Sequence, residues 1–297
     1  MTMNIVYFSK GVRGSRCLAY ILEAGYDVKA VVGVSREGSL EEIGRQYDFP
    51  LLFPEILNTG ATVRQLEDFD PDLFILCGYN KILKPLIIDI PPLGTINLHG
   101  GKLPEYRGAA PINWQIINGE SSGGCSIIYV DEGIDTGDIL AQELYPILPD
   151  DTHASVLEKT LHIFPALLGT VLRDIQQGTA KAVPQNPHEG AYFTRRYPRD
   201  SRIFWERMTD IQVHNLVRGM HGPYPAAFSY RADIKVEFDR TELLEEDITG
   251  TPGRVPMKRG SSAIVLAQNR GILVHEIRVQ GKSISPSEFF TIGDDLY

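Results

Sequence analysis

Short apolar runs alternate with helical patterns along roughly the first 150 residues of the chain. Each run is continuous rather than interrupted by polar residues, which is typical of strands that helices cover on both faces. These runs occupy residues 4–8, 28–34, 73–79, 95–100 and 125–131, and helical patterns fall at 14–24, 40–47 and 110–118. Ser39 and Glu42 form a capping-box pattern at the start of the second helix. The alternation predicts an α/β fold with a Rossmann-like, doubly wound, mostly parallel sheet.

The pattern changes in the second half of the chain. A long helix is expected over 152–176, and Pro165 inside it predicts a kink. Residues 181–202 are rich in proline and polar residues, as is typical of a linker. A short helix is expected at about 209–219.

Strand-like runs punctuated by Gly and Pro follow at 226–238, 262–268 and 272–280. They predict a small β-rich C-terminal domain that resembles an OB-like barrel. We therefore expect an α/β domain over 1–185, a linker over 186–204 and the β-rich domain over 205–297.

Composition adds few constraints. The 297 residues are 43% hydrophobic and 23% charged, as in ordinary globular proteins. No run of about 18 apolar residues occurs, so we expect no membrane partner. The N-terminal segment has the pattern of a first strand rather than of a signal peptide. Cys17, Cys77 and Cys125 form no CxxC pair, which favours neither disulfides nor zinc and indicates a cytoplasmic location.

The net charge of −9 argues against a large nucleic-acid interface, which needs a basic face. We therefore expect no nucleic-acid partner. A local basic cluster is still present at Arg195, Arg196, Arg199 and Arg202. It could bind an anionic ligand, and it could equally be a solvated linker.

The loop after the first strand, "SKGVRGS", is not a G-x-G-x-x-G motif, so dinucleotide binding is not predicted. Lys10 and Arg13, together with amides at the start of a helix, offer a seat for a phosphate. An ordinary strand–helix turn is the other interpretation.

Asn97 and His99 lie at the end of a predicted strand, where ligands bind in open α/β sheets. Downstream, an acidic loop contains Asp131, Glu132, Asp135 and Asp138. A carboxylate beside His99 would suit proton transfer, and an Asn could donate to an oxyanion in acyl transfer. A metal site, a solvated acidic turn and a structural histidine remain alternatives at this point.

Longer motifs favour acyl transfer. "NLHGGKLPEYRGAAPINW" (97–114), followed by "DEGIDTGDIL" (131–140), resembles the signature of the folate-dependent formyltransferases, whose fold is that of methionyl-tRNA formyltransferase. The resemblance covers nearly the whole chain. It implies that Asn97, His99 and Asp135 are catalytic. It also implies folate contacts from the following residues: Lys81, Ile82, Leu83, Asp131, Glu132, Gly133 and Ile134.

The same resemblance implies a reaction. An acceptor amine attacks the formyl carbon of 10-formyltetrahydrofolate directly, and no metal is required. Asn97 stabilises the oxyanion, His99 moves the proton from the amine to the folate nitrogen, and Asp135 tunes His99. Two positions depart from the family pattern: the usual "SLLP" is "GKLP" here (101–104), which introduces Lys102, and "IFW" (203–205) lacks the usual acid.

The sequence constrains the substrate that accepts the formyl group less than it constrains the donor or the catalytic residues. From residue 200 onward, 12 Lys and Arg face 14 Asp and Glu, which argues against tRNA. We therefore expect a nucleotide-linked amino sugar of bacterial surface-polysaccharide (lipopolysaccharide) biosynthesis, which the sugar-nucleotide N-formyltransferases use. The candidate residues for contacting this acceptor are Lys10, Arg13, Lys102, Trp205 and Tyr224. For Trp205 and Tyr224, the other interpretation is packing in the core of the second domain.

Other functions stay open. The first alternative is a methionyl-tRNA formyltransferase, and the second is a formyl-folate hydrolase or a non-catalytic folate-binding module. A homodimer is an option that the sequence leaves undecided.

Overall fold

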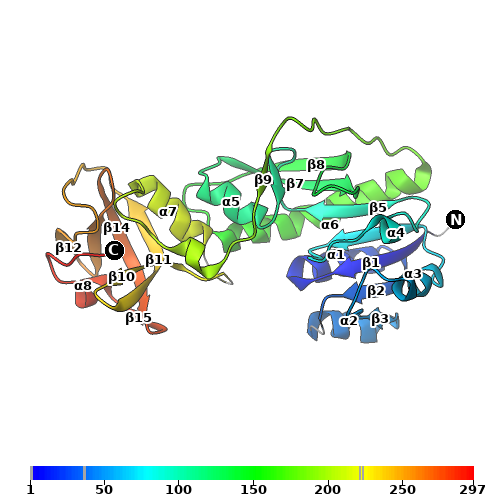
Figure 1. Ribbon diagram of the computed structural model, residues 1–297, viewed down its shortest axis with the longest axis horizontal. Coiled ribbons are helices and arrows are strands. Elements are labelled where there is room, and N and C mark those ends of the chain that lie inside the picture. The colour runs from blue at the N-terminus through cyan, green and yellow to red at the C-terminus, as the bar shows by residue number, and fades with distance from the viewer. Residues whose placement is uncertain (1–2, 36–37, 221, 223) are drawn as a thin grey trace. The chain divides into compact units, whose positions relative to one another are not determined.

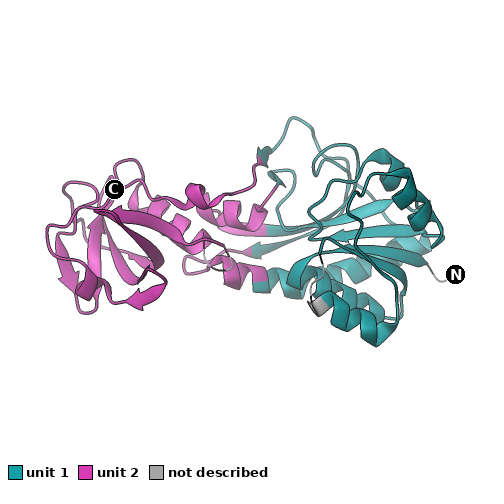
Figure 2. Cartoon of the chain, turned by 60° about the horizontal axis from the view of Figure 1, so that its bottom comes forward, with its two compact units in different colours: residues 1–108, 124–145, 158–192 teal, residues 109–123, 146–157, 193–297 magenta. Residues whose placement is uncertain are grey.

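The computed structural model describes residues 3–35, 38–220, 222 and 224–297. The side chain of Ser39 is outside the described part, and so is its predicted capping box. The chain forms two compact units (Figure 2). Unit 1 comprises Met1–Gly108, Gly124–Tyr145 and Glu158–Tyr192, and unit 2 comprises Ala109–Gly123, Pro146–Leu157 and Phe193–Tyr297. Each unit combines segments that are separate in sequence, whereas the domains expected from the sequence are contiguous. The units do not test those boundaries, which stay a prediction.

The larger sheet has seven strands in the order β3-β2-β1-β4-β5-β7-β8 (Figure 1). These strands are β1 (Asn4–Ser9), β2 (Asp27–Gly33), β3 (Leu51–Leu52), β4 (Leu73–Cys77), β5 (Thr95–His99), β7 (Ser122–Tyr129) and β8 (Ile139–Pro146). The first five pair in parallel, and β7 runs antiparallel to β5. The predicted Rossmann-like, mostly parallel α/β sheet is therefore confirmed.

The helices of this part follow apolar spacings of three and four residues. In α1 (Gly11–Glu23), the buried positions include Gly14, Cys17, Leu18 and Ile21, which form one stripe facing the sheet. The other helices are α2 (Gly38–Tyr47), α3 (Gly60–Glu67), α4 (Pro85–Ile88) and α6 (His153–Gln177). The sequence patterns missed α3, α4, β3 and β8.

The long helix α6 runs through Pro165 as one helix. By length and composition alone it could cross a membrane, because its most apolar window has a mean hydropathy of 1.2. However, Phe164, Leu168, Val171 and Leu172 are buried on one side of it. This stripe is that of an amphipathic helix packed on a protein core.

Unit 2 contains a six-stranded antiparallel sheet in the order β10-β11-β14-β13-β12, with β15 paired to β14. Its strands are β10 (Ala227–Arg231), β11 (Ile234–Leu243), β12 (Met257–Arg259), β13 (Ser262–Leu266), β14 (Gly271–Val279) and β15 (Lys282–Ile284). Its helices are α5 (Pro111–Ile117), α7 (Asp210–Gly219), α8 (Pro286–Phe289) and the short 3₁₀ helix η1 (Pro198–Ser201). The predicted β-rich C-terminal domain is confirmed.

Two further short strands, β6 (Tyr106–Gly108) and β9 (Ala191–Phe193), pair with each other and form a separate two-stranded sheet.

Helix α7 is fixed at its start by a buried carboxylate. Thr209 and Gln212 form a capping box, and Asp210 in the first turn is 2% exposed. Asp210 accepts hydrogen bonds from Asn269 Nδ2 at 2.8 Å and Arg270 Nε at 2.7 Å. Burial raises the pKa of Asp210, but these hydrogen bonds outweigh it and hold the pKa below the ordinary value of 3.8.

We expect Asp210→Ala to lower the free energy of unfolding of unit 2 by about 1–3 kcal/mol at neutral pH, because Asn269 and Arg270 lose a buried, charged acceptor. Since folding depresses this pKa, the stabilisation is present above about pH 4 and is lost as the pH falls through the folded pKa. Trp114 and Trp205 both belong to unit 2, so tryptophan fluorescence during urea unfolding reports it. A difference between wild type and variant that stays constant from pH 7 to pH 3 would contradict this role.

Candidate active site

Strand β5 places an amide and an imidazole together at the carboxyl edge of the sheet. Asn97 and His99 are two residues apart, so their side chains lie on the same face of the strand. Asn97 is half-buried and His99 is 5% exposed. The neighbouring parallel strand β4 ends in register beside them, with Cys77 opposite Leu98. The two side chains therefore lie where ligands bind in open α/β sheets.

The loop that follows β7 folds back tightly on itself. Asp131 Oδ1 accepts hydrogen bonds from Gly133 N at 3.0 Å and Thr136 Oγ1 at 2.6 Å. A Cβ on Gly133 would lie 2.0 Å from Thr136 Oγ1, and one on Gly137 would lie 1.9 Å from a carbonyl oxygen of β7. Only glycine permits both approaches. The turn also holds Asp135 in the left-handed region, with φ of +54°.

The carboxylate of Asp135 joins the parts of the site. Its Oδ2 accepts a hydrogen bond from the Gly108 amide at 2.8 Å and lies 3.4 Å from His99 Nδ1. Its Oδ1 lies 3.4 Å from Asn97 Nδ2, which donates to it. The other ring nitrogen, His99 Nε2, is 2.6 Å from the carbonyl oxygen of Tyr106.

The shorter of the two ring contacts favours one tautomer of the neutral imidazole, because the Tyr106 carbonyl and the Asp135 carboxylate can both only accept. A carbonyl oxygen can only accept, so Nε2 carries the hydrogen that is donated to Tyr106. In the neutral ring, Nδ1 then carries the lone pair and is the atom that can take up a proton. Nδ1 lies beside the Asp135 carboxylate, which would balance the positive charge that this proton brings.

A second set of side chains holds the Asp135 turn. Gln185 Nε2 donates to the carbonyl oxygens of Asp135 and Gly137, at 2.9 and 2.7 Å. Arg107, which is 1% exposed, donates from Nε and a terminal nitrogen to Gln185 Oε1, at 3.1 and 3.0 Å. Arg107 also donates to the backbone oxygens of Asn186 and Glu189. No role was predicted for Gln185 or Arg107, although Arg107 lies within the "LPEYRG" stretch.

The two segments that are predicted to contact folate, 81–83 and 131–134, each have one large apolar side chain exposed to solvent. After β4, Lys81 Nζ donates to the carbonyl oxygen of Pro54 at 3.0 Å, and Leu83 is buried. Between them, Ile82 is 75% exposed. In the acidic loop, Ile134 is 56% exposed. Large apolar side chains exposed this far are available to contact a ligand, which suits the predicted folate contacts.

Two candidate acceptor residues belong to unit 2. Trp205 is 2% exposed, packs in the hydrophobic core of that unit and donates from Nε1 to Ser229 Oγ at 2.9 Å. Its ring therefore offers no face to a ligand. Tyr224 is 37% exposed and contacts the ring of His153 edge to face.

Two of the other candidates have protein partners in unit 1. Lys102 Nζ forms an ion pair with Glu105 at 2.9 Å. The Arg13 guanidinium lies over the ring of Phe164, 5.2 Å from its centroid. Arg13 also faces the buried thiol of Cys77. Burial raises the pKa of that thiol, but hydrogen bonding with the Cys17 thiol and the charge of Arg13 outweigh burial and lower the pKa below its ordinary value. Lys102 and Arg13 therefore each have a contact within the fold. The presence of these two residues can be explained without a nucleotide-sugar ligand.

Comparison with known sequences identifies relatives over both units. The chain matches the formyl transferase family over residues 29–172 and the formyl transferase C-terminal domain over residues 196–294. The methionyl-tRNA formyltransferase of Acetivibrio thermocellus is 34% identical over 289 residues, which is 93% of this chain and 92% of the relative. Five further methionyl-tRNA formyltransferases are 27–33% identical.

Solved structures share the fold. An N-formyltransferase from Helicobacter canadensis, in complex with folinic acid and dTDP-3-aminofucose, is 19% identical with a TM-score of 0.70, over 92% of this chain and 98% of that chain. HypX from Aquifex aeolicus, in complex with tetrahydrofolic acid, is 18% identical with a TM-score of 0.68. That match covers 100% of this chain and 51% of HypX, so the chain spans about half the length of HypX.

The curated relatives correct the predicted acceptor. Six methionyl-tRNA formyltransferases match at 27–34% identity, so the predicted nucleotide-linked amino sugar, its place in surface-polysaccharide biosynthesis and the exclusion of a nucleic-acid partner are wrong. The physical error was to use a summed charge. Phosphates respond to the local field, and residues 194–207 hold five arginines against Asp200 and Glu206.

Because Gln185 holds the Asp135 turn, Gln185→Ala should lower turnover by about 10- to 100-fold with a smaller change in KM, the scale on which a misplaced group costs rate. Gln185→Glu separates the two contacts, since a carboxylate can still accept from Arg107 but cannot donate to the two carbonyls. Both variants should speed amide hydrogen exchange at Gly108, whose partner is Asp135. Wild-type turnover in Gln185→Glu would show that the donor contacts do not position Asp135.

Proposed function

Because this chain belongs to the formyl transferase family, we propose that it transfers the formyl group of 10-formyltetrahydrofolate to the amine of methionyl-tRNA in the cytoplasm. The enzyme class, a one-carbon transferase, follows from the family. The observation that carries the choice of acceptor is the identity to methionyl-tRNA formyltransferases over both units, which reaches 34% over 289 residues. The folate donor agrees with the tetrahydrofolate and folinic acid held by solved proteins of the same fold.

The contacts of the site supply a sequence of steps. The acceptor nitrogen attacks the formyl carbon, and Asn97 Nδ2 donates to the oxyanion that forms. His99 Nδ1 accepts the proton of the attacking amine, since Nε2 is committed to Tyr106. As the bond from the formyl carbon to the folate N10 breaks, His99 returns the proton to that nitrogen. Asp135 positions the imidazole and balances its transient charge.

The folate is proposed to bind along the carboxyl edge of unit 1. The backbone of Lys81, Ile82 and Leu83 follows β4, and Asn58 Nδ2 already fixes the Ile82 carbonyl at 2.9 Å. The exposed side chains of Ile82 and Ile134 supply apolar surface for the folate rings. Backbone donors and acceptors of these segments would orient the pterin.

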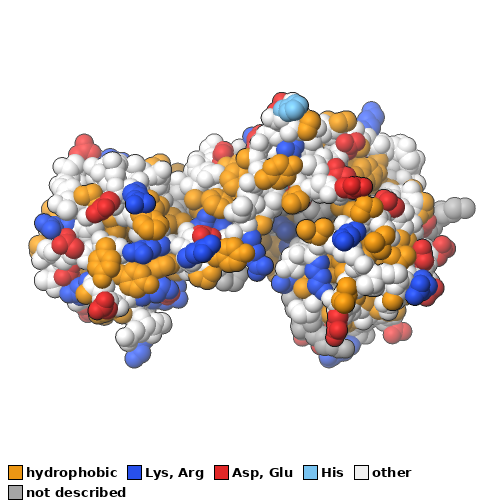
Figure 3. Space-filling view, viewed as in Figure 1, with side chains coloured by type: hydrophobic (Ala, Val, Ile, Leu, Met, Phe, Trp, Pro, Cys, Tyr) orange, Lys and Arg blue, Asp and Glu red, His pale blue; other side chains and the backbone are white. Residues whose placement is uncertain are grey.

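Unit 2 carries arginine and aromatic side chains suited to a phosphate backbone. Arg195, Arg199 and Arg207 are exposed, and Arg199 and Arg207 lie 5.9 Å from the rings of Tyr197 and Phe204. Basic and hydrophobic side chains are likewise mixed over unit 2 on the face in Figure 3. Arginine binds phosphate by charge and aromatic rings can stack on unpaired bases, so this surface fits tRNA.

His99→Ala should reduce formyl transfer by about 10²–10⁴-fold, the usual loss when a general acid–base group is removed. Asn97→Ala should reduce kcat by about 10²–10³-fold, since it removes one oxyanion donor. His162→Ala is the matched control, because His162 is exposed on α6 and lies outside the site. The assay is single-turnover transfer from 10-formyltetrahydrofolate. Near wild-type rates in either site variant would refute its assigned role.

The acceptor is tested by incubating the enzyme with charged initiator tRNA, with free methionine and with 10-formyltetrahydrofolate alone. We expect formyl-methionyl-tRNA, no formylmethionine and no hydrolysis of the folate. Affinity for tRNA should fall steeply with salt, because phosphate contacts release counterions.

Replacing Arg195, Arg199 and Arg207 together by Ala should weaken tRNA binding. The slope of log affinity against log salt concentration should become shallower by about one unit for each phosphate contact that is lost. Arg240→Ala is the control, because Arg240 is exposed in unit 2 but paired with Glu276 at 2.7 Å. The proposed acceptor is wrong if methionyl-tRNA is not formylated. An unchanged salt slope in the triple variant would move the tRNA interface to another surface.

A further inference from the structure

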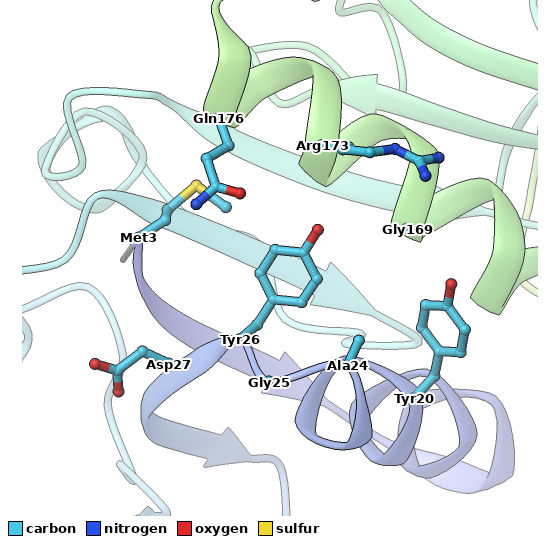
Figure 4. A pocket seen from close by; sticks show the side chains of 9 residues that line it. All are labelled: Met3, Tyr20, Ala24, Gly25, Tyr26, Asp27, Gly169, Arg173 and Gln176. Carbon is cyan, nitrogen blue, oxygen red and sulfur yellow. The ribbon is translucent and has the colours of Figure 1, made fainter. Parts of the chain in front are cut away.

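A cavity of about 390 Å³ lies in unit 1, far from the chemistry just described. It is lined by the end of α1, the residues that lead into β1 and β2, and one side of α6 (Figure 4). β1 and β2 are parallel to β4, so their starts are at the amino edge of the sheet, whereas Asn97 and His99 lie at the carboxyl edge. Its volume falls in the range of pockets that bind small molecules, about 300–1,000 Å³. No step of formyl transfer uses it.

Hydrogen-bond donors converge on this cavity. The hydroxyls of Tyr20 and Tyr26 point from α1 and the turn after it toward α6, and Arg173 comes from α6 (Figure 4). Arg173 makes one weak hydrogen bond, to Thr170 Oγ1 at 3.3 Å, which leaves most of its five N–H donors available. Within the part of the chain that the structure describes, no carboxylate pairs with Arg173.

The electrostatics of the lining favour an anion. Asp27 is the acid of the lining, and Lys29 neutralises it through an ion pair at 2.6 Å. Burial raises the pKa of Tyr26, and the charge of Arg173 offsets part of that rise, which also shows how near the two groups are. The Tyr26 hydroxyl therefore keeps its hydrogen at neutral pH and donates it. The Arg173 side chain is exposed, and its guanidinium is the charged group of the lining with which no described carboxylate pairs.

A glycine in the middle of α6 gives the cavity its shape. A Cβ on Gly169 would lie 2.4 Å from the hydroxyl oxygen of Tyr20, so the tyrosine can lie against the helix only because residue 169 has no side chain. Glycine inside a helix costs about 0.5–1 kcal/mol relative to alanine. A glycine at this position is therefore explained if the close approach of Tyr20 to α6 serves ligand binding.

We propose that this cavity is a binding site for a small metabolite that bears a carboxylate or a phosphate. The Arg173 guanidinium and the two tyrosine hydroxyls bind its anionic group, and the apolar faces of Met3 and Ala24 contact its organic part. The site is separate from the donor and acceptor sites, so it does not depend on which acceptor the enzyme formylates.

Two variants test the site in different ways. Arg173→Ala removes the charge. Gly169→Ala displaces the Tyr20 hydroxyl while adding a better helix former, so the fold should be kept. Arg64→Ala is the matched control, because Arg64 is an exposed arginine of unit 1 on α3 that does not line the cavity.

The measurement is a titration of the full chain with citrate and, separately, with inorganic phosphate, followed by amide NMR shifts at constant ionic strength. For wild type and Arg64→Ala we expect saturable shifts at Gly25 and Gly169 with at least one probe. The probe that binds more tightly identifies the carboxylate or phosphate class. Both cavity variants should weaken binding by about tenfold or more, the loss expected for a charge-assisted contact.

The proposal is overturned if neither probe shifts these amides in wild type. It is also overturned if Arg173→Ala binds as tightly as Arg64→Ala, or if the saturable shifts occur at Gly108 beside His99 instead.

Discussion

The site depends on one carboxylate held in an unfavourable backbone conformation. Asp135 has a left-handed φ of +54°, and from there its two oxygens reach the Gly108 amide, His99 and Asn97. A residue other than glycine in this region costs energy and persists only when its surroundings hold it. Gly133 and Gly137 allow the close approaches of the turn, and Gln185 donates to the carbonyl oxygens of Asp135 and Gly137. Together these contacts supply the restraint.

The placement of His99 follows from the same framework. β6 brings the Tyr106 carbonyl to Nε2 and the Gly108 amide to Asp135, so one short strand sets both the tautomer of the imidazole and the orientation of the carboxylate. Nδ1 is thereby left as the proton acceptor beside a negative charge. Acid–base chemistry at this site is a consequence of which backbone groups the turn and the strand present.

The sequence predicted those parts of the fold that local pattern determines. Buried parallel strands are continuous apolar runs, so β1, β2, β4 and β5 were found, whereas β8 was missed because it is largely exposed and has no such run. Asn97 and His99 were found because strand period puts i and i+2 together. Gln185 and Arg107 were missed because their contact spans 78 residues and no local pattern predicts it. The sequence left Trp205 undecided for a related reason, since its type suits both a ligand face and a core, and the structure places it in the core.

Charge was the least informative part of the sequence. A total of −9 describes the whole chain, and much of the acid in unit 2 is paired with arginine, as Asp239 is with Arg278 and Asp295 with Arg254. What a polyanion meets is the local arrangement, which the exposed Arg195, Arg199 and Arg207 make basic. Summed charge therefore could not identify the acceptor, and full-length relatives did.

The central claim is that the Asp135 framework leaves His99 Nδ1 free to accept a proton. The most direct measurement is a pH series of ¹⁵N NMR spectra of the imidazole nitrogens, with His99 identified by the signals that are absent from the His99→Ala spectra. The account predicts that, in the neutral form of the ring, Nε2 carries the hydrogen and Nδ1 carries none, because Nε2 donates to the Tyr106 carbonyl. A neutral ring with its hydrogen on Nδ1 would contradict it.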